Sequence, residues 1–356
     1  MDVSLKAFLA LSLTRGLGGE SVRLLLKEFG SPDAVFAASI GSLKSVVKAE
    51  IAAEIHKGIV DDAVAPALAW LEEPDNHIVT LADSDYPQAL LNIPDPPLLL
   101  YVKGRLDLLN RAALAIVGSR SATPQGIHNA EAFAKSLSDA GLCIISGLAH
   151  GIDASAHRGA LRGRGSSIAI VGTGLDKVYP AANRELAHAL AQHGTLVSEF
   201  PMGTPPLAAN FPRRNRLISG MSLGCLVVEA SLQSGSLITA RLALEQGRDV
   251  FGIPGSIHAP QSKGCHALLK QGAKLVETAQ DILEELGGQL VATTQPAKSE
   301  SQASALLDHL GYDPVDVDTL SMRCGLTIAE LSAMLLALEL EGRISALPGG
   351  LYQRIH

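Results

Sequence analysis

The spacing of hydrophobic residues changes near residue 110. Up to about residue 72, apolar residues recur at helical spacing on both sides of a glycine-rich turn at Gly16–Gly19. This pattern predicts a helical domain over residues 1–75. Residues 76–110 are rich in proline and contain two short apolar runs. They predict a connecting segment with strands of its own.

From Arg111 onward, continuous apolar runs alternate with helical patterns. The runs predict strands at residues 113–119, 142–147, 167–173, 195–200, 225–230, 249–254 and 273–278. Between the first two runs, Thr123 is suited to cap a helix and Pro124 to occupy its first turn. Continuous apolar strands that alternate with helices imply a parallel sheet covered on both faces. The predicted fold class is therefore α/β, with an extended Rossmann-like domain over residues 76–288.

The periodicity disappears after this domain and then returns. Residues 289–304 are polar and aperiodic, which predicts a linker. Three helical segments follow, the last opened by a capping box at Thr327–Glu330, and a hairpin is expected around Pro348–Gly350. Three helices and a hairpin predict a winged-helix-like domain over residues 305–356.

Composition limits the classes of protein that fit. The chain has 356 residues, 47% hydrophobic and 18% charged, and no apolar run approaches the ~20 residues of a membrane span. Its first residues do not have the pattern of a signal peptide. Four cysteines stand far apart without a CxxC pair, so we expect reduced thiols and no metal site. GxxxxGK[ST] and GxGxxG motifs are absent. We expect a cytoplasmic protein with no cofactor and no membrane contact.

Charge is divided among the predicted domains. Residues 1–110 carry 9 basic and 15 acidic side chains (net −6), residues 111–278 carry 16 and 10 (+6), and residues 279–356 carry 4 and 11 (−7). This places any polyanion on the middle domain. The N-terminal pattern is that of helix-hairpin-helix or SAM-like units, for which the acidic balance favours an accessory role over DNA binding. A protein-contact or regulatory role is likewise favoured for the last domain, whose third helix has no Lys or Arg but carries Glu330, Glu339 and Glu341.

An arginine cluster is the main candidate for chemistry. Arg213, Arg214 and Arg216 lie directly before an apolar strand. Guanidinium groups bind phosphate oxygens bidentately, although a solvated basic helix face has the same sequence pattern. In parallel sheets, ligands bind beyond the carboxyl ends of the strands. There, glycine-rich loops can turn their amides toward phosphate; these loops contain Gly118, Ser119, Arg120, Ser146, Gly147, Gly151, Ser234, Gly235 and Ser236.

No catalytic arrangement stands out. Ser119 lacks the GxSxG elbow, and Asp153 is expected to cap a helix. His150 and His157 are expected at the start and on the face of that helix. Glu229, at the end of a strand, is a possible acid or base of a nucleotide-processing enzyme of the ribohydrolase type; alternatively, its carboxylate fixes the nearby arginines.

Seven motifs carry a resemblance to the DprA/Smf family, the DNA-processing proteins of natural transformation. They are IVGSRSATPQG, IISGLAHGIDASAH, GTGLDKVYP, SEFPMG, FPRRNRLISG, VVEASLQSGSLITARLALEQGRDVFGIPG and GCHALLKQGAKLV, which lie between residues 116 and 276. The resemblance as a whole covers nearly all of residues 76–288. The resemblance implies a non-enzymatic protein that binds and protects incoming single-stranded DNA and loads the RecA recombinase. The DNA contacts it implies are Arg120, the backbone around Gly147–Gly151, and Arg213, Arg214 and Asn215–Arg216 of the FPRRNR motif.

The sequence departs from the family at two basic positions, where it has Ala181 and Ala208. We expect Lys177 and Arg184 to compensate. Aromatic content is only 4%, so binding should rely on phosphate contacts, with Phe211 as the obvious stacking candidate.

The segment GCHALLKQGAKLVET predicts a short helix and a strand at the edge of the sheet. An open apolar edge invites pairing with another chain, unless the helix that follows covers it. The resemblance implies a homodimer through this region, with an interface at His266, Leu268, Leu269 and Leu275.

Overall fold

The computed structural model divides the chain into two compact units, residues 1–287 and 288–356. It describes residues 3–293 and, further along the chain, residues 306–307, 309–310, 315–324, 326, 331, 335, 338, 344–347 and 351–354. Along the described residues, no helix is long and apolar enough to cross a membrane.

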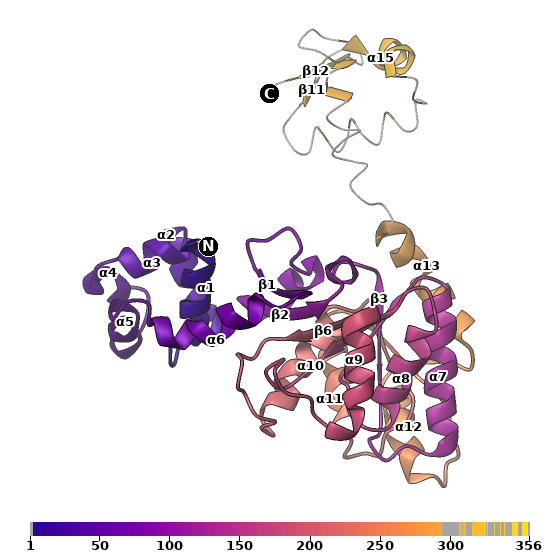
Figure 1. The fold of residues 1–356 in the computed structure, drawn as a ribbon. Helices are drawn as coiled ribbons and strands as arrows, with labels where there is room; N and C mark the ends of the chain where they lie inside the picture. The colour runs from indigo at the N-terminus through magenta and orange to yellow at the C-terminus, as the bar shows by residue number, and fades with distance from the viewer. Residues whose placement is uncertain are drawn as a thin grey trace. The chain divides into compact units, whose positions relative to one another are not determined.

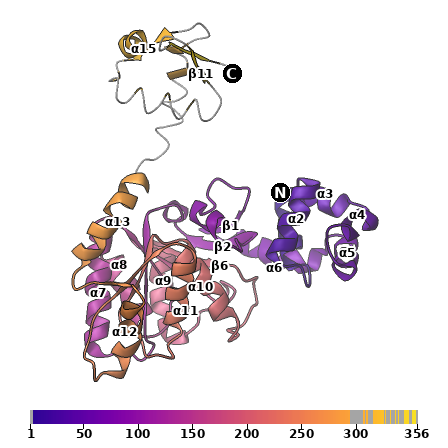
Figure 2. The same cartoon turned by 180° about the vertical axis from the view of Figure 1, so that it is seen from behind.

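A nine-stranded sheet organises the first unit, in the order β1-β2-β6-β5-β4-β3-β7-β8-β9 (Figures 1 and 2). From β6 to β9 all neighbours pair in parallel. Each of the seven predicted strands is present, as β3 (Ala113–Val117), β4 (Cys143–Ser146), β5 (Ser167–Ile170), β6 (Thr195–Ser198), β7 (Gly224–Val227), β8 (Asp249–Gly252) and β9 (Lys274–Leu275). The predicted Rossmann-like fold class is confirmed.

The segment at residues 76–110 does form strands, but they belong to the main sheet. β1 (Asn76–Thr80) pairs with β2 (Leu99–Gly104), and β2 pairs antiparallel with β6. Tyr101 of β2 lies opposite Ser198, which continues the hydrogen-bonded ladder beyond β6. The segment therefore covers an edge that the parallel strands would leave open.

Six helices cover the two faces of the sheet (Figures 1 and 2). On one face lie α7 (Pro124–Asp139), α8 (Ile152–Leu161) and α9 (Arg184–His193), and on the other α10 (Asn210–Gly220), α11 (Ser236–Glu245) and α12 (Lys263–Lys270). The predicted cap of α7 is confirmed: Gly126 N donates to Thr123 Oγ1 at 3.0 Å, and Pro124 is the first helical residue. Short 3₁₀ turns also occur, at η1 (Gln88–Asn92), η2 (Leu106–Leu108), η3 (Ala181–Asn183) and η4 (Pro260–Ser262).

The strand order places a switch point in the middle of the sheet. The chain runs outward from β3 through β4 and β5 to β6, then returns to β7 on the other side of β3. The loops that leave β3 and β7 therefore lead to helices on opposite faces. In open parallel sheets, this separation leaves a crevice at the carboxyl ends of the two strands.

The N-terminal helices pack against β2. They are α1 (Val3–Leu13), α2 (Gly19–Phe29), α3 (Pro32–Ala37), α4 (Ile40–Lys44), α5 (Ala49–His56) and α6 (Asp61–Leu71). Their core includes Leu9 and Leu25 and extends to Tyr101 of β2, whose ring meets Trp70 edge-on at 5.9 Å. The predicted helical character of this region is confirmed.

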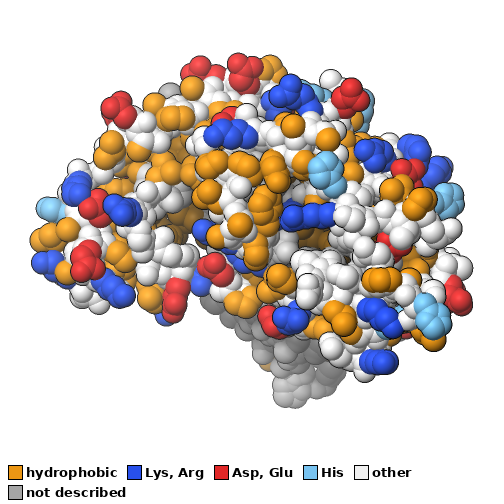
Figure 3. Space-filling view, turned by 90° about the horizontal axis from the view of Figure 1, so that it is seen from below, with side chains coloured by type: hydrophobic (Ala, Val, Ile, Leu, Met, Phe, Trp, Pro, Cys, Tyr) orange, Lys and Arg blue, Asp and Glu red, His pale blue; other side chains and the backbone are white. Residues whose placement is uncertain are grey.

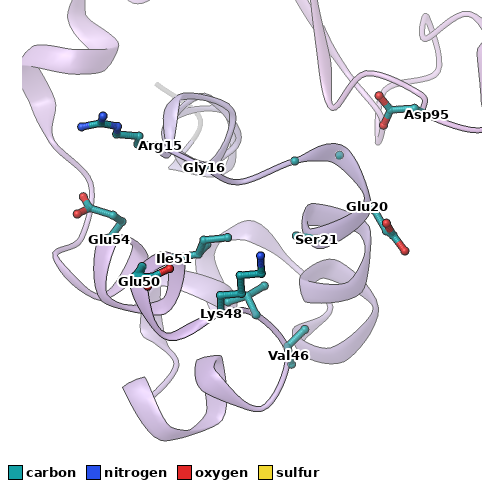
Figure 4. A pocket seen from close by; sticks show the side chains of 13 residues that line it. Arg15, Gly16, Glu20, Ser21, Val46, Lys48, Glu50, Ile51, Glu54 and Asp95 are labelled. Atoms are coloured by element: carbon teal, nitrogen blue, oxygen red, sulfur yellow. The ribbon is translucent and has the colours of Figure 1, made fainter.

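A cavity of about 880 Å³ lies between the glycine-rich turn before α2 and the turn before α5 (Figure 4). Arg15 and Lys48 are its basic side chains, and its acidic ones are Glu20, Glu50, Glu54 and Asp95. Acidic residues therefore outnumber basic ones around this turn.

The last helix of the first unit runs further than the sequence pattern predicted. α13 spans Ala279–Thr293, so the predicted linker at 289–304 begins too early. The reason is a period of four that the apparent polarity of the segment conceals, with apolar residues at Ile282, Leu286 and Leu290. Ile282 and Leu286 are fully buried.

The second unit contains the predicted hairpin. β11 (Ile344–Leu347) pairs with β12 (Leu351–Arg354), which also pairs with β10 (Val315–Asp316); α15 spans Val317–Cys324. Buried leucines, among them Leu306, Leu320 and Leu331, form its core. The expected capping box at 327–330, the hairpin tip at 348–350, and Glu330, Glu339 and Glu341 lie outside the described residues.

Candidate nucleic-acid interface

A groove with a volume of about 690 Å³ lies at the switch point between β3 and β7. Loops after β3, β4, β5 and β7 and one face of α10 contribute to its wall. The groove is therefore built mainly from the segments that the sequence singled out. Its lining residues include Gly118, Ser119, Arg120, Asp153, Tyr179, Phe211, Arg214, Asn215, Ser234, Gly235 and Ser236.

The loops after β3 and β4 touch each other at the base of the groove. Gly151 has a φ of 73°, and a Cβ at this position would overlap the carbonyl oxygen of Ser119. Leu148, in the same loop, has a φ of 59°, a left-handed conformation that costs free energy in a residue with a side chain. This close approach leaves Arg120 exposed at the rim.

Asp153 holds the loop after β4 through hydrogen bonds to its backbone. It is the second residue of α8, but its Oδ2 accepts the backbone N–H groups of Gly147 (3.2 Å) and Ala149 (3.4 Å) in the preceding loop. Asp153 was expected to cap its own helix, but its carboxylate instead accepts hydrogen bonds from this loop. Burial raises the pKa of the Asp153 carboxyl above its ordinary value, and the nearby Arg214 cation opposes this shift.

The arginine cluster lies on a helix rather than in a loop, and the helix divides it. α10 begins at Asn210, so residues three or four positions apart share a face. Phe211, Arg214 and Asn215 line the groove, whereas Arg213 and Arg216 face away from it toward Glu199. A linear motif does not show this division, because it depends on the helical turn.

Arg214 is enclosed in the wall of the groove. The residue is 5% exposed, and its Nη1 donates to the carbonyl oxygen of Ile170. A Cβ at position 147 would overlap the Arg214 guanidinium, so Gly147 makes room for this cation. Burial lowers the pKa of Arg214 to about 10, which leaves it charged at neutral pH. The structure thus places it as a cation beneath the loop after β4.

Arg213 and Arg216 share one acceptor, Glu199. Arg213 lies 2.9 Å from Glu199 Oε1 and is 56% exposed; Arg216 pairs with the same oxygen and is only 12% exposed. Arg216 also lies 3.7 Å from Asp95, which pairs with Arg23 of α2 at 3.3 Å. These ion pairs connect α10 with the N-terminal helices.

Glu229 does not fix the arginines, so this part of the sequence interpretation is wrong. Its carboxylate accepts the backbone N–H of Thr123 at 2.9 Å and also the Thr123 hydroxyl. Both donors lie at the start of α7, where the helix dipole favours a carboxylate. Glu229 therefore anchors α7 to the end of β7.

An aromatic pair with a cation stands at the groove. The Arg120 guanidinium carbon lies 5.7 Å from the centroid of the Phe211 ring. The Tyr179 ring lies 5.6 Å from the Phe211 ring, with 38° between their planes. Tyr179 was not predicted from the sequence; its signal was the position of the Tyr-Pro pair in the loop that follows the third predicted strand.

Three other residues that the sequence predicted as DNA contacts lie outside the lining of the groove. Ser146 is fully buried and donates from its hydroxyl to the carbonyl oxygen of Ile116 at 2.6 Å. Lys177 donates to the carbonyl oxygen of Gly203 at 2.5 Å. Arg184 is exposed at the start of α9. Ser146, Lys177 and Arg184 are not among the residues that line the groove.

The loop after β7 supplies polar groups to the groove. The Ser234 and Ser236 hydroxyls are 2.7 Å apart, and Ser236 is the first residue of α11, whose N-terminus faces the crevice side of the sheet. Ser231, at the start of the predicted loop, also lines the groove, and the polar lining residues that were not predicted from the sequence are Ser121, Thr239 and Gln261. Only their position after a strand or within the motif could have indicated them.

The two histidines differ in surroundings. His150 is exposed in the loop before α8. His157 is fully buried on α8, with its Nδ1 2.7 Å from the Ser167 hydroxyl. Burial, aided by the nearby Arg214 and Arg158 cations, lowers the pKa of His157 to about 3, so its imidazole is neutral at physiological pH.

At the far edge of the sheet, the residues predicted to form the dimer interface differ in their exposure to solvent. β9 is the edge strand, and Leu275 on it is 54% exposed. Leu268 is 6% exposed and belongs to the core, because the amphipathic α12 turns it inward; it is not available at a surface. Leu269 and His266 are partly exposed, and His266 Nε2 lies 3.0 Å from the carbonyl oxygen of Gly255.

The helix that follows β9 contacts this edge without covering Leu275. Lys274 lies 2.6 Å from Glu285 of α13 and 2.9 Å from Asp249 of β8. α13 thus meets β9 through an ion pair, and the apolar side chain next to it stays exposed.

Charged side chains are not gathered into one continuous patch on the face shown in Figure 3, where basic, acidic and hydrophobic groups alternate.

Comparison with known sequences identifies the family. The sequence model described as DNA recombination-mediator protein A matches residues 77–287, more than half of the chain. The chain belongs to this family. The DprA winged helix domain matches residues 290–350, so the predicted winged-helix domain is confirmed as well.

Relatives in this family cover most of the chain. Protein Smf of Escherichia coli (strain K12) is 46% identical over 299 residues, which span 81% of this chain and 80% of that protein. DNA processing protein DprA of Streptococcus pneumoniae (strain R6) is 48% identical over 206 residues, 58% of this chain and 73% of that protein.

Two solved DprA structures resemble this one. The X-ray structure of DprA from Streptococcus pneumoniae superposes with a TM-score of 0.71 at 37% identity and covers 79% of this chain and 97% of that chain. DNA processing protein A from Helicobacter pylori, a protein with a single-stranded DNA binding mode, gives a TM-score of 0.55 at 31% identity over 60% of this chain and 97% of that chain.

Proposed function

We propose that this protein binds single-stranded DNA in the groove at the switch point and serves as a non-enzymatic mediator that loads the RecA recombinase on incoming DNA. The observation that carries the proposal is the exposed Arg120 at the rim of a groove whose loops present glycine amides and serine hydroxyls. Membership of the recombination-mediator family supports it. The single-stranded DNA binding mode of the Helicobacter pylori relative supports it further.

The groove suits a phosphate backbone. Arg120 offers a guanidinium, Ser119 and Ser234 offer hydroxyls, and the N-terminus of α11 at Ser236 favours negative charge. Arg214 adds a buried positive charge behind the loop at Gly147. None of these groups requires a particular base, so binding should depend on salt and little on sequence.

A homodimer through the β9 edge is the second part of the proposal. Leu275 supplies an exposed apolar side chain on an edge strand, and Leu269 and His266 lie on the adjoining α12. A two-fold pair would carry two grooves, and one strand that engages both gains avidity from the linkage alone. The protein would act in the cytoplasm, where incoming DNA meets RecA.

Arg120→Ala tests the groove directly. Because the variant lacks one guanidinium that pairs with phosphate, affinity for single strands of any sequence should fall. The negative slope of log K against log salt should become shallower by ~0.7. Arg162→Ala is the matched control, because this exposed arginine lies at the C-terminal end of α8 and pairs with Glu131 at 2.8 Å. Intact affinity in Arg120→Ala, or equal reductions in both variants, would contradict the proposal.

A further inference from the structure

Tyr179 is the more exposed of the two aromatic residues that line the groove. It lies in the loop between β5 and η3, and it is 47% exposed. Of the described residues that line the groove, only Tyr179 and Phe211 are aromatic. An exposed tyrosine ring in the lining of a groove offers a flat apolar surface to a ligand.

The Phe211 ring is more enclosed. It has the Arg120 guanidinium on it, the Tyr179 ring beside it, and the backbone of Gly172 so close that a Cβ there would lie 3.1 Å from Phe211 Cδ1. Phe211 is correspondingly only partly exposed. Its contact with Tyr179 helps to hold the tyrosine ring at the groove.

We propose that Tyr179 is a base-stacking residue, on which one unpaired nucleobase of a bound strand lies while the adjacent phosphates reach Arg120. The inference rests on the proposed binding of single-stranded DNA and adds a basis for strand selectivity. Stacking tolerates every base because each has a π-face. It requires an unpaired base, however, since bases in a duplex are already stacked on their neighbours. Phosphate contacts alone do not provide this discrimination.

The test separates the contribution of the bases from that of the phosphates to DNA binding by the full-length protein. Binding is measured for a thymidine oligonucleotide and for an abasic oligonucleotide of the same length, with wild type, Tyr179→Ala, Tyr179→Leu and Tyr179→Trp. Leu207→Ala, which removes another exposed apolar side chain (53%) outside the groove lining, is the control. The two strands have equal phosphate charge, so their difference isolates the base.

Tyr179→Ala and Tyr179→Leu should lower the affinity for the thymidine strand about 5- to 150-fold, the range expected for one stacked base. Both should bind the abasic strand as wild type does, with an unchanged salt slope, and Tyr179→Trp should retain the preference for thymidine. Tyr179→Leu keeps an apolar group against Phe211, so a folding defect limited to the alanine variant does not affect the conclusion.

Other outcomes overturn the inference. Equal reductions on both strands would give Tyr179 a structural or phosphate-binding role, and unchanged affinity for both would remove it from the interface. If wild type binds neither oligonucleotide, the proposed function itself fails. If wild type binds both and the Tyr179 variants bind them equally well, only the stacking inference fails.

Discussion

At the scale of single residues, the groove depends on two buried charged side chains in its wall, Arg214 and Asp153. The Arg214 guanidinium fills the space that a Cβ at Gly147 would need, and Asp153 accepts the backbone N–H of the same glycine. The loop after β4 is thus held by a buried cation and a buried carboxylate. Both groups therefore fix the shape of this loop at the groove.

Gly147→Ala tests this packing. The added Cβ would overlap the Arg214 guanidinium, and the free energy of unfolding in urea should fall by about 1–3 kcal/mol, as for an overpacked core. Gly287→Ala is the control, because nothing lies within 4 Å of its Cβ position. Equal stability of the two variants would contradict the described packing.

His157 makes stability depend on pH. In the unfolded chain its pKa is near the ordinary 6.5, whereas in the folded protein burial lowers the pKa to about 3. Between these values the unfolded state binds the extra proton. The contribution of His157 is therefore complete above pH 6.5 and is lost as the pH falls, by up to about 1.4 kcal/mol per pH unit.

His157→Gln removes this titration. The free energy of unfolding should fall less steeply between pH 6.5 and pH 5 in the variant than in wild type, measured by urea unfolding at each pH. Parallel pH profiles for the two proteins would show that the buried imidazole does not titrate as described.

At the scale of elements, α10 is a two-sided helix. One side lines the groove, and the other carries the ion pairs with Glu199 that lead through Asp95 to α2. The ordering of this helix is thereby tied to the N-terminal helices. A change at the interface of these helices has a physical route to the groove.

Arg216→Ala and Arg213→Ala compare a buried and an exposed ion pair, since both arginines share Glu199. Arg216 and Glu199 are 12% and 9% exposed, so removal of the Arg216 side chain takes away the buried partner of Glu199 and leaves it only the exposed Arg213, which should cost about 1.5–3 kcal/mol in unfolding free energy. Arg213 is 56% exposed, and its removal should cost less than about 1 kcal/mol. The reverse order of stabilities, measured by urea unfolding, would contradict this arrangement.

Local patterns were sufficient for most elements. The seven parallel strands and the cap of α7 follow from apolar runs and from Thr123 and Pro124, which act on their own neighbourhoods. The pairing of β2 with β6 did not follow, because it joins residues nearly a hundred positions apart. The extension of α13 was hidden because Ile282 and Leu286 signal burial only once a period of four is recognised.

The site was predicted by position but not by orientation. Strand ends located the loops at Gly118–Arg120 and Ser234–Ser236, which do line the groove. Whether an arginine of α10 faces the groove or Glu199 depends on helical phase and on tertiary packing. Tyr179 was missed for a similar reason, since its proximity to Phe211 arises only when β5 and α10 are brought together.

At the scale of the whole molecule, the open edge of the sheet matters most. β1 and β2 cover one side, while β9 leaves the other with Leu275 exposed. Leu275→Arg should convert the proposed dimer into a monomer, seen by light scattering as half the mass. The monomer should bind short oligonucleotides normally and long ones more weakly, because a monomer has no second groove to supply avidity.

Leu24→Arg is the matched control, since Leu24 is also an exposed leucine (47%) but lies on α2. It should remain dimeric. A Leu275→Arg protein that stays dimeric, or a wild type that is already monomeric, would rule out the proposed dimer.

The most direct test of the groove is a photo-crosslinking map. A single strand that contains 5-iodouracil is bound to the full-length protein, irradiated and digested, and the linked peptides are identified by mass spectrometry. We expect links to peptides that contain Tyr179 or Phe211, the aromatic residues of the groove. Links confined to the glycine-rich turn before α2 or to the winged helix domain would contradict binding in the groove.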